Sequence, residues 1–246
     1  MGLSLARNQA SAEMVDRPTV RYSGEFDRFD ADELAALARA AVDHQESTLY
    51  LAAAWTGLRQ GELLGCGGPL TNSTCRRYPA AASANDVDLA GQRVRVRRAW
   101  SQAAKAEKAP KSGKVRSVPL VAELIPPLDR LSQREHFTGE DDLVFCTEVG
   151  EHLNGWTMRR KYHAALKRAG LRKLTMHSLR HCFGTVAVRA FPLSDVQAML
   201  GHAHVTTTMR YVHHRPGADD AAKLSSAFRG NDVSPLVPAL AAETAV

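Results

Sequence analysis

The chain has no uninterrupted run of about 18 apolar residues, the length that a membrane-spanning helix requires. Its N-terminus also lacks the apolar region of a secretory signal peptide. Cysteine is scarce: the four cysteines have no spacing typical of a metal site and follow no secretory signal. We therefore expect free thiols, no bound metal and a cytoplasmic protein. The cysteines are Cys66, Cys75, Cys146 and Cys182.

A nucleotide-binding loop is also missing, because Gly113-Lys114 is followed by Val115 and lacks the upstream glycine of a P-loop. We therefore expect no nucleotide cofactor.

Acidic residues are in the minority, and the 246 residues carry a net charge of +6 with a pI of about 9.3. This balance favours an anionic partner. Hydrophobic residues make up 44% of the chain, which is enough for a substantial core.

Hydrophobic spacing predicts an α+β protein that is mainly α-helical with a small antiparallel β-sheet. The alternation Arg-Val-Arg-Val-Arg within residues 87–100 predicts a strand, and residues 114–120 its hairpin partner. Asp30 is a plausible N-cap for the first helix. Helices are expected over residues 25–42, 48–64 with an interruption near Gly57, 121–131, 155–169, 174–190, 194–200, 205–213 and 218–228.

A short stretch near the C-terminus gathers two imidazoles, a guanidinium and a phenol. In the motif His-Ser-Leu-Arg-His, residues His177, Arg180 and His181 fall on one face of a helix. A glycine then ends the next helix and leaves His202 in the following turn, and the last short helix carries Tyr211. A cation that neutralises phosphate charge, an imidazole that moves protons and a phenol that attacks would suit chemistry on a phosphodiester.

A second part of the candidate site lies earlier in the chain, in the motif Trp-Thr-Gly-Leu-Arg-Gln-Gly-Glu-Leu-Leu-Gly at residues 55–65. It contains Arg59, and Glu62 follows three residues later, where a carboxylate can orient the guanidinium. Together with the His-x-x-Arg-His run, the Gly-His pair and the final tyrosine, in this order, the chain resembles the tyrosine recombinase or phage integrase family. The resemblance runs from about Phe26 to Phe228. It implies the integrase catalytic fold, which breaks and rejoins DNA.

The resemblance also implies a role for each residue of the motifs. Tyr211 would be the nucleophile that forms a 3′-phosphotyrosine, and Arg59 and Arg180 would clamp the scissile phosphate. His177 would assist proton transfer with the phenol, and His202 would donate a hydrogen bond to the phosphate. An ion-paired structural arginine is the alternative for the two guanidinium positions.

Lys111 resembles the hairpin lysine of the family, which protonates the departing 5′ oxygen. Lys114 is the competing choice for this general acid. His181 occupies a motif position that usually supports the helix, and we do not expect it to be catalytic. A zinc site built on His177 and His181 is disfavoured, because the motif lacks a glutamate and Arg180 would place a positive charge beside the metal.

Basic residues are concentrated between residues 91 and 119, where nine Lys and Arg residues accompany a single acid, Glu107. A basic hairpin of this kind fits a phosphate backbone, and a solvated strand face is the alternative. We predict DNA contacts by arginines of this hairpin and of the helix at 155–169. These are Arg93, Arg95, Arg97, Arg116, Arg159 and Arg160.

Two features depart from the family pattern. In the family, a helical DNA-clamp domain usually precedes the catalytic domain, but the segment 1–25 looks like a linker. We expect the catalytic domain to span residues 26–216, and residues 217–246 to form a C-terminal helix and tail. We therefore expect weak DNA binding and inefficient recombination by the chain alone. Residues 65–85 also replace a turn of about five residues with a loop, which we expect to leave Arg59 less well held.

The sequence thus favours a site-specific recombinase that acts on double-stranded DNA as a homotetramer. The alternative is a truncated, catalytically inactive DNA-binding remnant of an integrase. A type IB topoisomerase would share the chemistry, but it would need a clamp around DNA that this chain lacks.

Overall fold

The computed structural model describes residues 27–68, 70, 86–111, 113–139 and 142–212. The linker-like segment 1–25, most of the loop 65–85 and the helix expected at 218–228 lie outside these residues. The helices are α1 (Ala31–Arg39), α2 (His44–Thr56), α3 (Gln60–Leu64), the 3-10 helix η1 (Ala122–Leu124), α4 (Ile125–Ser132), α5 (Gly155–Arg168), α6 (Met176–Ala190), α7 (Leu193–Leu200) and α8 (Val205–Met209). The strands are β1 (Val87–Asp88), β2 (Arg93–Val96), β3 (Ala99–Ser101), β4 (Ala106–Lys108) and β5 (Arg116–Pro119).

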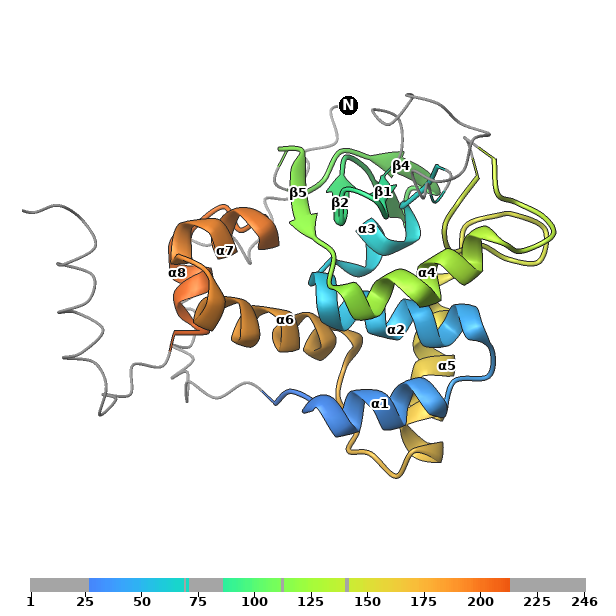
Figure 1. Cartoon of the computed structure of the whole chain (residues 1–246), viewed down its shortest axis with the longest axis horizontal. Coiled ribbons are helices and arrows are strands. Elements are labelled where there is room, and N and C mark those ends of the chain that lie inside the picture. Colours follow the sequence, from blue (N-terminus) through green and yellow to red (C-terminus); the bar gives the residue numbers. More distant parts are fainter. Residues whose placement is uncertain (1–26, 69, 71–85, 112, 140–141, 213–246) are drawn as a thin grey trace, which may run out of the picture. The chain divides into compact units, whose positions relative to one another are not determined.

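Helix α2 lies at the centre of the helical layer and packs against α1, α4 and α6 (Figure 1). It is buried on most of its surface, which is why its sequence carries apolar residues almost all round. Asp30 caps helix α1 as expected: its side chain accepts from the Glu33 N–H, and the Glu33 carboxylate accepts from the Asp30 N–H. The predicted helices are present over the described residues, with different ends. The first spans Ala31–Arg39 rather than 25–42, the second begins at His44 rather than at residue 48, and the last ends at Met209 rather than at residue 213.

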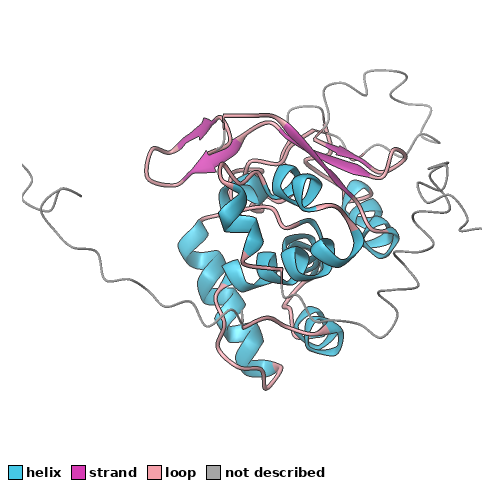
Figure 2. Cartoon of the chain, turned by 90° about the vertical axis from the view of Figure 1, so that its left-hand side faces the viewer, coloured by secondary structure: helices cyan, strands magenta, loops and turns pink. Residues whose placement is uncertain are grey.

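The strands lie along one side of the helices (Figure 2). β1, β2 and β5 form an antiparallel sheet in the order β1-β2-β5, in which Val94 faces Val118. These two valines and Val96 are buried in the same core as α2, so the predicted alternation is confirmed. The expectation of a single strand over residues 87–100 is wrong, because β3 leaves this sheet and pairs with β4 in a separate hairpin.

The two ends of the long loop between α3 and β1 meet. The Gly67 N–H donates to the Asp86 carboxylate at 2.9 Å, and the Asp86 N–H donates to the Gly67 carbonyl at 3.1 Å. Because the chain leaves and re-enters the fold at neighbouring positions, the extra residues need not displace the core. Leu64, just before the loop, is buried in the main core.

Two glycines shape the turns that hold functional residues. Gly57 ends α2 with φ of 63°, and Gly201 ends α7 with φ of 62°, a left-handed conformation that other residues adopt at a cost. The first turn brings Arg59 to the start of α3, and the second presents His202. Within the described part of the chain, no helix combines the length and apolar character needed to cross a membrane.

Candidate active site

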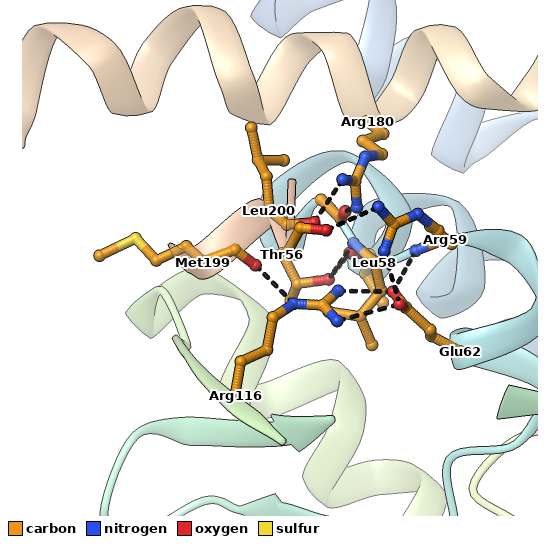
Figure 3. Close-up of polar contacts among 11 residues, drawn as sticks. Thr56, Leu58, Arg59, Glu62, Arg116, Arg180, Met199 and Leu200 are labelled. Carbon is orange, nitrogen blue, oxygen red and sulfur yellow. Dashed lines mark hydrogen bonds and ion pairs between the residues drawn. The ribbon is translucent and has the colours of Figure 1, made fainter. Parts of the chain in front are cut away.

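Arg59 caps the start of α3 and lies partly exposed beside Glu62. Its Nη1 donates to the Glu62 carboxylate at 3.0 Å, and its Nη2 donates to the Gly201 carbonyl at 2.9 Å (Figure 3). The Glu62 carboxylate also accepts from the Arg59 backbone N–H at 2.8 Å. The expectation that the long loop leaves Arg59 poorly held is therefore wrong, because both its backbone and its guanidinium are fixed.

Arg180 lies in the second turn of α6 and is only 2% exposed. Its two terminal nitrogens donate to the carbonyls of Gly57 and Leu200, which join α6 to the ends of α2 and α7 (Figure 3). Burial and the neighbouring Arg59 charge lower the pKa of Arg180 to about 10. The guanidinium therefore keeps its charge at neutral pH. Because the site is buried and its dielectric constant is low, this charge interacts more strongly with a neighbouring charge than it would in water.

Arg116 is the third arginine of this cluster, and the structure corrects its predicted role. It is buried, its Nε donates to the Met199 carbonyl at 2.7 Å, and its terminal nitrogens donate to Glu62 at 2.9 and 2.6 Å. Its guanidinium is thus paired with the Glu62 carboxylate inside the fold rather than displayed on the outer face of the basic hairpin, as the sequence had suggested. Sequence reasoning grouped it with the surface arginines because it lies on the basic hairpin.

The three arginines therefore bind three successive carbonyls, those of residues 199, 200 and 201, at the end of α7. The C-terminal end of a helix carries partial negative charge, so cations gathered there are stabilised. Glu62 lies among them: burial alone would raise its pKa, but hydrogen bonds and charge from Arg116 and Arg59 lower it. The carboxylate is thus ionised at neutral pH and aligns two of the guanidiniums.

His202 follows this helix end directly. Its Nδ1 lies 2.9 Å from the Thr208 hydroxyl, which fixes the ring against α8. Burial and the charges of Arg180 and Arg59 lower the pKa of His202 to about 4, so the imidazole is neutral at neutral pH. A neutral imidazole that bonds through Nδ1 leaves Nε2 for another partner.

Tyr211 lies just after α8 and is 3% exposed. Its ring packs in a small core with Val196 and Leu200, and it lies parallel to the His202 ring with centroids 6.4 Å apart. Its hydroxyl lies 2.8 Å from His181 Nδ1.

The structure therefore brings two histidines of α6 to the phenol side of the site. The rings of His177 and His181 meet edge to face with centroids 4.7 Å apart. The pKa of His177 is lowered by burial and by the charges of Arg180 and Arg59, so this imidazole is also neutral at neutral pH. The expectation that His181 only supports the helix missed its contact with Tyr211, which no spacing in the sequence indicated.

Lys111 lies exposed in the turn between β4 and β5, and Lys114 is exposed in the same turn. Exposure in this turn does not distinguish the two ammonium groups. The assignment of Lys111 as general acid therefore stays a prediction.

The remaining predicted DNA contacts differ in their surroundings. Arg93 is half exposed and Arg95 partly exposed on the sheet, whereas Arg97 pairs with the buried Asp86 at 2.8 Å. Arg159 and Arg160 are both exposed on α5. Among the described residues, no group of three or more His, Cys, Asp or Glu side chains could hold a metal ion.

Arg160 extends over the ring of an exposed tryptophan, Trp156, with 5.1 Å between its Cζ and the ring centroid. This contact holds the Arg160 guanidinium against an exposed ring on the surface of α5.

Comparison with known proteins gives consistent matches. The family model described as "Phage integrase family" matches residues 80–217. A tyrosine recombinase XerC-like protein of Caldanaerobacter subterraneus subsp. tengcongensis is 28% identical, over 85% of this chain and 56% of the relative. Tyrosine recombinase XerC of Roseiflexus castenholzii is 30% identical, over 64% of this chain and 51% of the relative. The chain thus spans about half the length of the curated relatives it matches.

Solved structures match the fold as well. A crystal structure of XerA recombinase has a TM-score of 0.57 and 26% identity, and the match covers 89% of this chain and 68% of that one. The Tn1549 transposon integrase, solved in complex with transposon right end DNA, has a TM-score of 0.61 and 19% identity, and the match covers 87% of this chain and 69% of that one. The predicted fold class is thereby confirmed.

Proposed function

Because the chain belongs to the phage integrase family, we propose that it is a site-specific DNA recombinase that cleaves and rejoins strands through a 3′-phosphotyrosine at Tyr211. One observation carries the proposal: the charged guanidiniums of Arg59 and Arg180 share the end of α7, which also holds His202 and packs against the phenol. Cations, a neutral imidazole and a phenol are the groups that cleavage of a phosphodiester without a metal ion requires.

In this reaction the phenolic oxygen of Tyr211 forms a bond to the scissile phosphorus, and the bond from phosphorus to the 5′ oxygen breaks. Arg59 and Arg180 neutralise the charge that grows on the non-bridging oxygens, and His202 donates a hydrogen bond to one of them. A phenol in water has a pKa near 10, so an attacking tyrosine hydroxyl needs a proton acceptor. His177, which is neutral, takes that proton.

The 5′ oxygen would depart as an alkoxide, which is a poor leaving group unless a general acid protonates it. We assign this proton to the Lys111 ammonium, whose position in a hairpin turn lets it approach the DNA when the hairpin contacts it. The phosphotyrosine conserves the energy of the broken bond, so the reverse attack by a 5′ hydroxyl rejoins a strand without a nucleotide cofactor.

The partner in this account is double-stranded DNA, which the exposed basic residues would hold by its phosphates. The proposed contacts are Arg93 and Arg95 on the sheet and Arg159 and Arg160 on α5, and Arg97 would contribute beside its pairing with Asp86. Recombination joins two duplexes, so we also propose a homotetramer on paired sites, in the cytoplasm.

The chemistry of the cleaved ends tests this proposal. Genomic DNA fragments from the encoding organism are incubated with the protein, denatured and digested with protease. We expect a nucleotide adduct on the peptide that contains Tyr211, and DNA ends that carry a free 5′ hydroxyl. The inactive-remnant alternative would give DNA binding without an adduct, and an adduct on any other residue would contradict the assignment of the nucleophile.

A further inference from the structure

The contact between His181 and the Tyr211 hydroxyl lies outside the roles assigned above. Nδ1 of His181 is 2.8 Å from the phenolic oxygen, which is a good hydrogen-bond distance. The histidine belongs to α6, whereas the tyrosine follows α8, 30 residues later in the sequence. A polar contact between distant segments at the reacting atom is more than local support of a helix.

The tyrosine ring has little freedom to leave this position. It packs in the small core shared with Ala187, Val196 and Leu200, and it lies directly over Gly184 of α6. A methyl group added at Gly184 would come within 2.6 Å of the phenol ring carbon that bears the hydroxyl. The ring is therefore seated on α6, and the hydrogen bond to His181 fixes the direction of its oxygen.

The protonation state of His181 suits an acceptor. Burial, together with His177, Arg180 and Arg210, lowers the pKa of His181 to about 4, so its imidazole is neutral at neutral pH. In the tautomer with the proton on Nε2, Nδ1 accepts a hydrogen bond from the phenol. Such a bond fixes the direction of the hydroxyl in the resting site and leaves the oxygen lone pairs directed elsewhere; the proton passes to His177 only when the phenol attacks.

We infer that His181 is a positioning residue for the nucleophile: its imidazole holds the Tyr211 oxygen in a fixed direction for attack on a bound phosphate. Fixing the reacting atom in this way contributes to rate through orientation rather than through binding. The inference rests on the proposed function, because it assigns His181 a part in the attack by Tyr211. It adds a residue to the site without giving it contact with DNA.

The test measures the attack step alone. The substrate is a duplex recovered by covalent capture with the wild-type chain and resynthesised with sulfur in place of the leaving 5′ oxygen. A thiolate leaves without protonation, so the rate of adduct formation reports on the nucleophile and not on Lys111. His181→Leu removes the hydrogen bond, His181→Asn keeps a polar group near the Nδ1 position, and His136→Leu is a control at an exposed histidine.

We expect His181→Leu to form the adduct about 10- to 100-fold more slowly in a single turnover, with unchanged DNA affinity. His181→Asn should recover most of the rate, which a purely structural role for the imidazole would not predict. Equal or faster adduct formation by a folded His181→Leu would overturn the inference. If the wild-type chain forms no adduct, the proposed function fails and the positioning role fails with it.

A second measurement needs no DNA. The protein is labelled with ¹³C-tyrosine, and the resonance of the Tyr211 ring carbon that bears the hydroxyl is assigned by its loss in Tyr211→Phe. We expect that resonance to shift in His181→Leu, to return toward its wild-type position in His181→Asn and to stay unchanged in His136→Leu. An unchanged resonance in folded His181→Leu would show that the hydrogen bond does not hold the phenol, which also overturns the inference.

Discussion

The carboxylate of Glu62 lies 2.9 and 2.6 Å from the two terminal nitrogens of Arg116, in a position almost closed to solvent. This pair ties β5 to α3, while the same arginine donates to the carbonyl of Met199 at the end of α7. The pair therefore connects the basic hairpin with the helix end where Arg59 and Arg180 converge.

Removal of one member of this pair should be costly. Arg116→Met leaves the Glu62 charge buried with only Arg59 beside it, so we expect the free energy of unfolding to fall by about 3–5 kcal/mol. Arg93→Met, at a half-exposed arginine of the same sheet, should change it by about 0.5 kcal/mol or less. Urea unfolding of the two variants measures this difference, and equal stabilities would contradict the structural role of Arg116.

Gly184→Ala should destabilise the protein although alanine normally favours a helix. The added methyl group would collide with the Tyr211 ring, and we expect a loss of about 1–3 kcal/mol. The control is the same change in a Tyr211→Ala background, where the collision is absent and alanine should be neutral or stabilising. If Gly184→Ala has the same effect in both backgrounds, Tyr211 does not pack on α6.

Stability should depend on pH through His181 and His202. Burial and nearby positive charge lower both pKa values from 6.5 to about 4, so between these limits the unfolded chain binds protons that the folded chain does not. The free energy of unfolding should therefore fall as the pH drops from about 6.5 to about 4, with no contribution from these groups above that window. Urea midpoints of wild type and of His181→Asn/His202→Asn, compared across the window, should show a weaker pH dependence in the double variant.

The sequence predicted much of this architecture for identifiable reasons. Helix boundaries followed from the Asp30 capping box and from glycines such as Gly57 and Gly201, which act locally. The pairing of Arg59 with Glu62 was also predictable, since a three-residue spacing on a helix start fixes their proximity. The order of the motifs was enough to identify the family, because the catalytic chemistry constrains which residue types must be present.

What the sequence could not supply depends on contacts between distant segments. Arg116 lies on a strand whose pattern reads as a basic surface, and only the packing of α7 against β5 reveals that it is buried. Likewise, the contact of His181 with Tyr211 depends on how the segment after α8 returns to α6. The separation of β3 and β4 into their own hairpin also follows from tertiary packing against α3 rather than from alternation in the sequence.

The assignment of Lys111 as general acid makes a chemical prediction. Lys111→Ala should slow adduct formation by about 100-fold or more on ordinary DNA, because the 5′ oxygen then leaves without a donated proton. Substitution of sulfur for that oxygen should restore the rate, whereas Lys114→Ala should be nearly normal on both substrates. A defect of Lys111→Ala that sulfur does not relieve would move the lysine from proton donor to DNA binding.

Covalent capture tests the central claim most directly. Wild type and Tyr211→Phe are incubated with fragmented genomic DNA, denatured, and compared for DNA that stays attached to protein. The phenylalanine variant loses only the hydroxyl, and circular dichroism and a gel-shift assay verify that it folds and binds DNA. We predict attached DNA with wild type alone, enriched in one sequence. Equal attachment by both proteins, or none by a wild-type chain that binds DNA, would contradict a recombinase that acts through Tyr211.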